Sequence, residues 1–110
     1  MFGDGSSLRD YTFVDDIVTG VVAAVDRPLG YQIINLGNNT PNRLDDLIAA
    51  IGEAVGKAPI VRQLPDQPGD VPMTFASVER ARELLDFAPS TPLLDGLKKF
   101  VAWLNEVHPV

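Results

Sequence analysis

The sequence alternates short runs of strand-forming residues with longer stretches whose apolar residues recur at helical spacing, and this alternation predicts a mixed α/β fold. The clearest helical stretch runs from Arg43 to Val55, with Asp45 and Asp46 in its first turn and Gly56 as its stop. Its apolar positions are Leu44, Leu47, Ile48, Ile51 and Val55. We therefore expect one small mixed α/β domain over residues 1–110, with short strands and about four helices.

Three further helices are expected. A stripe of valines after two aspartates predicts a helix that ends before Pro28, a second helix runs to about Asp86, and a third covers the C-terminal end. Aspartate, serine and threonine accept hydrogen bonds from free helix amides, and proline suits a first helical position. The residues expected to begin or cap these helices are Asp15, Asp16, Ser77, Thr91 and Pro92.

Strand-forming residues occur in three short segments, 11–14, 31–36 and 60–64. The glycines of residues 3–5 predict a turn, so that residues 1–14 suggest a hairpin whose first strand is cut short at Met1. Three short strands are too few for a complete doubly wound nucleotide-binding sheet. We expect the chain to be a fragment of a longer protein.

Charge and composition exclude several classes of function. The net charge is −6, which disfavours binding to nucleic acid or to an anionic membrane. The sequence has no cysteine, so it offers no disulfide and no thiolate ligand. It also lacks an apolar run of the ~20 residues that a membrane-spanning helix needs. We expect a cytoplasmic protein.

The usual catalytic and cofactor motifs are incomplete. Residues 3–5 lack the third glycine of a dinucleotide fingerprint, and neither Tyr11 nor Tyr31 has a lysine four residues later, as a short-chain reductase requires. The single histidine, His108, lies in the last three residues, where a metal ligand is not expected. We expect no catalytic residue, no cofactor-binding residue and no metal ligand in this chain.

Two places suggest ligand contact. Arg9 lies between the glycine turn and a mostly apolar segment, so its guanidinium either pairs with Asp10 or projects towards an anion. The loop at 65–72 contains three prolines and displays the amide of Gln67 and the carboxylate of Asp70. A stiff loop loses little entropy when a ligand orders it. Residue chemistry alone leaves a structural role and a binding role open at both places.

Taken together, several segments resemble one family. Their order and spacing are similar to the C-terminal portion of extended short-chain dehydrogenase/reductases, the NAD-dependent epimerase/dehydratase enzymes, nearest the UDP-glucuronate 4-epimerase group. The resemblance spans essentially the whole chain. The segments that carry it are Phe2–Gly5, Arg9–Asp16, Asn35–Asn38, Gln67–Val71 with Thr74, and Ser90–Val101.

The resemblance implies a division of labour. In such enzymes an N-terminal Rossmann domain holds NAD and carries the catalytic tyrosine and lysine, and a smaller C-terminal domain closes over the nucleotide-sugar. Residues 1–110 would cover only the second domain, so NAD belongs to the intact enzyme and not to this chain. Whether the chain counts as an enzyme stays open, and we expect no activity from it alone.

Residue roles follow from the resemblance. Arg9 matches an arginine that contacts the diphosphate of a UDP-sugar, and Asp70 matches an acid that accepts hydrogen bonds from the ribose. Gln67 stands where galactose-type epimerases have a second phosphate-binding arginine, which favours the glucuronate-like group. Asn35 and Asn38 are expected to fix a loop. Epimerase, dehydratase and decarboxylase outcomes all stay open, because they depend on residues of the other domain.

Two rival interpretations remain. The chain could be a non-catalytic truncated product that associates with itself through the apolar face that the missing Rossmann domain would cover. It could also be a free-standing nucleotide-binding module.

Overall fold

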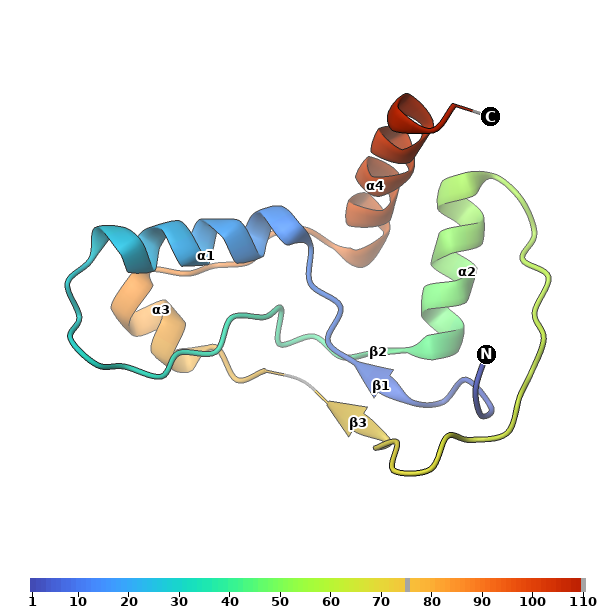
Figure 1. Cartoon of the computed structure of the whole chain (residues 1–110), viewed down its shortest axis with the longest axis horizontal. Coiled ribbons are helices and arrows are strands. Elements are labelled where there is room, and N and C mark those ends of the chain that lie inside the picture. The colour runs from blue at the N-terminus through green and yellow to red at the C-terminus, as the bar shows by residue number, and fades with distance from the viewer. Residues whose placement is uncertain (75, 110) are drawn as a thin grey trace.

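The computed structural model describes residues 1–74 and 76–109. This part of the chain forms four helices and a three-stranded mixed sheet, so the predicted small mixed α/β fold is confirmed (Figure 1). In chain order the elements are β1 (Leu8–Arg9), α1 (Val14–Asp26), β2 (Asn42–Arg43), α2 (Leu44–Val55), β3 (Met73–Thr74), α3 (Glu79–Leu85) and α4 (Leu93–Val107).

The sheet places Arg9 at its centre. The strand order is β2-β1-β3, with β1 antiparallel to β2 and parallel to β3. Arg9 is opposite Asn42 on one side and Thr74 on the other. Each strand has only two residues, so the ladders contribute few hydrogen bonds and the register needs support from elsewhere.

The helices were predicted well, but their caps were not. Helix α1 carries the aspartate pair in its first turn and does end before Pro28, and α2 ends at Gly56, whose φ of 80° lets its amide bond the Gly52 carbonyl at 2.9 Å. Ser77 and Thr91 do not cap α3 and α4, which are preceded directly by Val78 and Pro92 without a side-chain cap.

The segment before α4 is held by the first turn of α1. The Thr91 amide donates to an Asp16 carboxylate oxygen at 3.2 Å, so Thr91 is tethered to α1 two positions before α4 begins. Pro92 has a ψ of 153° and therefore stands just outside α4, not at its first helical position. The predicted boundary is wrong by one residue, as is common at helix ends.

The predicted strands are largely wrong. Residues 11–13 are irregular and Val14 already belongs to α1, so the expected hairpin does not form. The 60–64 segment contributes only an isolated bridge between Leu64 and Phe2. Segment 31–36 joins no strand within the described part of the chain. Alternating composition predicts a strand only where a partner strand is available to accept the backbone hydrogen bonds.

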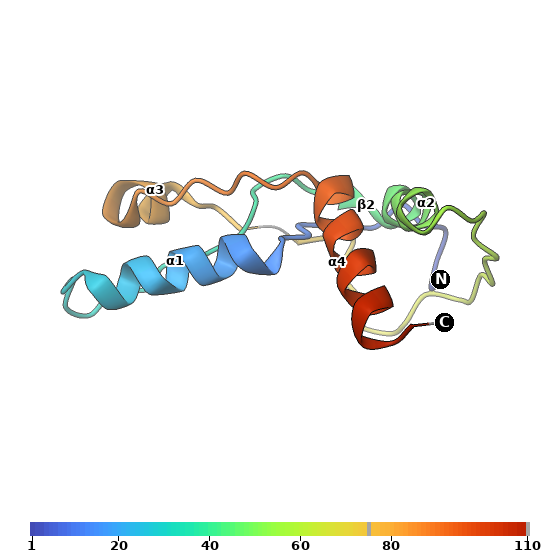
Figure 2. The same cartoon turned by 90° about the horizontal axis from the view of Figure 1, so that it is seen from above.

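The core is small and lies around α3. In the described part of the chain four hydrophobic residues are buried, namely Val78, Ala81, Leu85 and Phe87, and side chains from α1 and from residues 29–36 pack against them. Gly20 lets α1 approach closely, because a Cβ there would lie 2.8 Å from a methyl carbon of Leu36. The molecule is flat, with extents of 48 × 36 × 18 Å (Figure 2).

The flat shape leaves many apolar side chains uncovered. On α1 the residues Val14, Val18, Val21 and Val25 are between 50% and 80% exposed, and their spacing of four, three and four puts them on one stripe. Phe100 and Trp103 of α4 are 53% exposed. Such a surface has the apolar character of an interface. In the described residues no helix is long and apolar enough to cross a membrane.

Candidate functional site

Arg9 is in contact with Asp70, and Asp70 is the one of the two that lines a neighbouring groove. The Arg9 Nη2 atom donates to an Asp70 carboxylate oxygen at 2.7 Å, and Nη1 donates to the Leu8 carbonyl at 2.7 Å. The side chains are 26% and 48% exposed, so solvent reaches the pair. Of the two alternatives left open for Arg9, pairing with Asp10 is not what the structure shows. A guanidinium and a carboxylate 61 positions apart in sequence are brought into contact.

The groove itself is open and has a volume of about 790 Å³. Its lining includes the glycine turn on one side and the 63–66 and 70–72 segments on the other, Asp70 among them. The two sides are joined by the bond from the Gly3 amide to the Leu64 carbonyl and by the bond from the Leu64 amide to the Met1 carbonyl, each 2.7 Å. Short backbone bonds therefore fix the width of the groove.

Gln67 lies outside the lining of this groove. It is exposed, and its carbonyl accepts the Asp70 amide at 3.2 Å in a turn that also contains Gly69, with a φ of 81°. The turn orients the Asp70 backbone, while the Gln67 amide faces solvent at the rim. Of the three candidate residues, the structure brings the side chains of Arg9 and Asp70 into direct contact, whereas Gln67 contacts Asp70 through its backbone.

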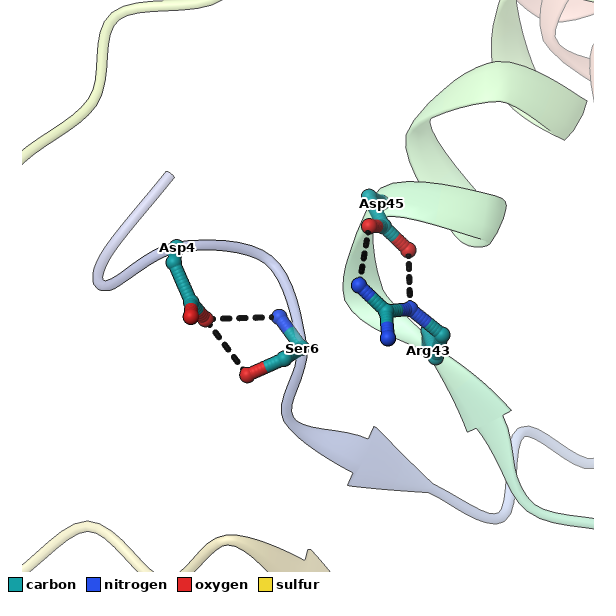
Figure 3. Close-up of polar contacts among 4 residues, drawn as sticks. All are labelled: Asp4, Ser6, Arg43 and Asp45. Carbon is teal, nitrogen blue, oxygen red and sulfur yellow. Dashed lines mark hydrogen bonds and ion pairs between the residues drawn. The ribbon is translucent and has the colours of Figure 1, made fainter.

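The glycine turn carries a second carboxylate. The Asp4 carboxylate accepts hydrogen bonds from the Ser6 hydroxyl and from the Ser6 amide, and these bonds lower the pKa of Asp4 below its ordinary value of 3.8 (Figure 3). Gly3 and Gly5 have φ values of 74° and 84°, which few other residues adopt. The turn is therefore held in shape by local hydrogen bonds and forms one wall of the groove.

A Ser6→Ala substitution tests this wall. Because the folded-state pKa of Asp4 is depressed, its hydrogen bonds contribute stability above the ordinary pKa and are lost as the pH falls through the folded pKa. Removing the hydroxyl, the first cause of the shift, should raise the pKa of Asp4 and weaken the loss of stability on acidification. Carboxyl-carbon NMR titration measures this pKa, with Ser7→Ala as the control. An unchanged Asp4 titration in Ser6→Ala would contradict the assignment.

A bidentate ion pair fixes the start of α2 next to the turn. Arg43 Nε and Nη2 donate to the two carboxylate oxygens of Asp45 at 2.9 and 2.7 Å (Figure 3). This contact raises the pKa of Arg43 and lowers the pKa of Asp45. The Asp45 amide donates to the Gly5 carbonyl at 2.9 Å, which ties α2 to the groove wall. Sequence analysis attributed Asp45 only to the helix start and did not find this pairing.

Asp10 was considered from the sequence only as a possible partner of Arg9, and its actual role was not predicted. Its carboxylate accepts the backbone amides of Asn38, Asn39, Thr40 and Ala76, at 2.9–3.3 Å. The expected loop-fixing role of Asn38 is thus present, through its backbone. The sequence feature that could have indicated this role is the asparagine pair after Gly37. Asn39 has a φ of 52°, and this conformation turns successive amides towards one anion.

A second, smaller hollow of about 260 Å³ lies where α4 meets α2 and the residues before α1. Its lining is mostly apolar and includes Phe13, Leu97 and Phe100. Tyr11 also lines it, and partial burial raises the pKa of its phenol. A phenol held protonated is a poor general base. In the described part of the chain no group of acidic or histidine side chains could hold a metal ion.

Comparison with known proteins finds its matches in one family. Residues 1–37 match the model of the NAD dependent epimerase/dehydratase family. The UDP-glucuronate 4-epimerase of Thermodesulfobacterium geofontis is 37% identical over 96% of this chain and 33% of its own length. Protein CapI of Staphylococcus aureus is 34% identical over 98% of this chain and 38% of its own.

Solved structures agree. The Bacillus cereus UDP-glucuronic acid 4-epimerase in complex with UDP-glucuronic acid and NAD has a TM-score of 0.89 at 30% identity, over 98% of this chain and 35% of that one. The Thermotoga maritima UDP-glucose 4-epimerase with UDP-glucose has a TM-score of 0.89 at 29% identity, over 97% and 34%. The chain spans about a third of the length of these relatives. By sequence and by fold, this chain matches part of an NAD-dependent epimerase/dehydratase.

Proposed function

We propose that this chain is the substrate-binding part of an NAD-dependent nucleotide-sugar epimerase or dehydratase, that it corresponds to the C-terminal third of such an enzyme, and that it grips the UDP moiety. The observation that carries the proposal is the contact between Arg9 and Asp70 at 2.7 Å beside the 790 Å³ groove. A guanidinium that can bind phosphate and a carboxylate that can accept hydrogen bonds from ribose hydroxyls therefore lie next to each other.

Binding would exchange partners within this pair. In the free chain Arg9 Nη2 is held by Asp70, and a diphosphate oxygen would take the place of the carboxylate. Phosphate accepts the planar guanidinium fork in the same bidentate geometry as a carboxylate does. The released Asp70 oxygen would then accept hydrogen bonds from the two ribose hydroxyls. The exchange keeps both charges partnered throughout.

Gln67 would contribute neutral hydrogen bonds at the rim. A glutamine offers an amide donor and acceptor but no charge, so the diphosphate would depend on Arg9 more than it does where a second arginine is present. We infer a glucuronate-like substrate, because Gln67 departs from the second arginine of galactose-type epimerases. The Bacillus cereus relative was crystallised with UDP-glucuronic acid.

The glycine turn at residues 3–5 does not fit the pyrophosphate of NAD. A dinucleotide pyrophosphate needs a glycine-rich turn that leads into a helix N-terminus. Here the turn at residues 3–5 leads into the strand β1, and the space beside Gly3 is filled by the Asp66 carboxylate. We therefore assign the cofactor, the catalytic tyrosine and the lysine to the remaining two thirds of the family fold.

The proposal predicts binding without turnover. Purified chain should bind UDP in calorimetry, since the Arg9 and Asp70 site is complete within it. The same chain mixed with NAD and UDP-glucuronate should give no epimerised sugar, because hydride transfer at C4 needs groups that it lacks. Epimerisation by the chain alone would contradict the division of labour. Binding of UDP weaker than millimolar would contradict the site.

Self-association is a second candidate property, and the valine stripe of α1 favours it. Val14, Val18, Val21 and Val25 are all at least half exposed and form one continuous face. We expect sedimentation velocity at high protein concentration to show a dimer or larger species, and Val18→Glu with Val25→Glu to restore a monomer. Thr19→Glu on the same helix is the matched control. A wild-type chain that stays monomeric would remove this candidate.

A further inference from the structure

The short central strand β1 ends at a carboxylate that holds both of its neighbours. The Asp10 Oδ2 atom accepts the amides of Asn39 at 2.9 Å, Asn38 at 3.1 Å and Ala76 at 3.3 Å, and Oδ1 accepts the amide of Thr40 at 3.2 Å. Residues 38–40 lead into β2, and Ala76 follows β3. One side chain thus bonds the segments on both sides of the strand that carries Arg9.

The hydrogen bonds to Asp10 help to fix the strand register, which the short ladders fix only weakly. Two-residue strands fix their register with very few backbone bonds, and a register error would turn the Arg9 side chain to the other face of the sheet. Four bonds to one charged acceptor, placed directly after Arg9, oppose such a shift. Hydrogen bonds to an ionised group are also the stronger kind.

The residues around the Asp10 carboxylate pack closely against it. A Cβ at Gly37 would lie 2.8 Å from Asp10 Oδ2 and 2.7 Å from the Ala76 Cβ, so only glycine fits between them. Asn39 has a φ of 52°, a conformation that asparagine tolerates better than most residues and that points the neighbouring amides inward. The chain thus adopts restricted conformations at two positions around this one acceptor.

We propose that Asp10 is a positioning residue for nucleotide binding: it holds β1 between residues 38–40 and Ala76, and so keeps the Arg9 guanidinium at the groove, in reach of Asp70. Asp10 itself does not touch the ligand. The inference rests on the proposed function, because it gives Arg9 the task of holding the diphosphate.

A double-mutant cycle with UDP as the probe tests the coupling. Asp10→Asn keeps the shape but presents its amide group to backbone donors, so UDP affinity should fall about tenfold, which corresponds to about 1.4 kcal/mol. In the Arg9→Ala background the same substitution should change UDP affinity less than twofold, because Asp10 acts through Arg9. Asp86→Asn is the matched control: it removes the same charge from an exposed residue with a φ of 52° that pairs with Arg27.

A second measurement does not depend on the ligand. In free wild-type protein the Arg9 Nε–Hε group should be ordered by NMR relaxation, and Asp10→Asn should lower this order while Asp86→Asn leaves it unchanged. Gly37→Ala, which crowds the carboxylate without removing its charge, should act like Asp10→Asn. If Asp10→Asn does not fold, two other measurements test the positioning role. One is the order of the Arg9 side chain in Gly37→Ala. The other is the amide exchange of Asn38, Asn39 and Thr40 in wild-type protein, which should slow on addition of UDP.

The outcomes separate the two claims. Wild-type protein that fails to bind UDP refutes the proposed function, and the order of the Arg9 side chain then still tests the positioning role. Wild-type protein that binds UDP, with Asp10→Asn equally tight or equally weakened in both Arg9 backgrounds, refutes the positioning role alone. Unchanged Arg9 order in Asp10→Asn and Gly37→Ala refutes it as well.

Discussion

Replacing Arg9 with alanine should lower the affinity of the chain for UDP by about 10- to 100-fold, the loss of about 1.5–3 kcal/mol expected for hydrogen bonds to a charged group. The guanidinium projects from the central strand, and Asp70 is the partner that a diphosphate would replace. Because the net charge of the chain is −6, no general attraction for an anion compensates for this loss. Isothermal titration calorimetry with UDP measures the change directly.

Two companion variants sharpen the result. Arg9→Lys keeps the charge but loses the planar fork, so its affinity should lie between those of wild type and Arg9→Ala. Arg80→Ala removes a guanidinium that bonds the Ile33 carbonyl, away from the groove, and should bind UDP as wild type does. Equal affinity of wild type and Arg9→Ala would show that the nucleotide does not depend on this residue.

Phe87→Ala should destabilise the chain by about 3–5 kcal/mol, a large share of the ~5–15 kcal/mol that keeps a domain folded. Phe87 is 3% exposed and belongs to a core of four buried residues, so the cavity would remove much of the packing between α1 and α3. Urea unfolding followed by circular dichroism measures the free energy of unfolding.

Phe100→Ala is the matched control for this change. Its ring is 53% exposed on α4, so the same loss of an aromatic side chain should cost far less. If Phe87→Ala and Phe100→Ala were equally destabilised, the folded chain would not be organised around the α3 core.

The helices could be predicted from the sequence because each one carries its own evidence. The 3-and-4 spacing from Leu44 to Val55 and the stop at Gly56 are local features, and the structure keeps both. The strands could not, because pairing depends on distant segments. Residues 31–36 keep the alternation of a strand: Ile34 and Leu36 pack on the core while Tyr31 and Ile33 are 89% and 68% exposed.

The strands that do form could not be predicted for the same reason. Leu8–Arg9, Asn42–Arg43 and Met73–Thr74 have no strand-like composition, and only their position in the folded chain brings them together. Propensity summed over two residues carries no usable signal. The short sheet is a consequence of tertiary contacts, with the Asp10 carboxylate among them.

The candidate site, too, could be predicted only in part. Arg9 and Asp70 were found because a charged residue stood in an apolar setting and another in a proline-rich loop, and the family resemblance gave both a role. The role of Asp10 was overlooked because its carboxylate accepts backbone amides, and backbone donors leave no trace in side-chain patterns. Glycine at position 37 and asparagine at position 39 were the indirect signs.

The most direct test of the central claim is an NMR titration of isotope-labelled chain with UDP, following the Arg9 guanidinium and the Asp70 amide together. The account predicts that both signals shift and saturate with one dissociation constant, while the resonances of Arg80 and Asp86 stay in place. Saturating UDP that leaves the Arg9 and Asp70 signals unmoved, or that shifts a different surface instead, would contradict it.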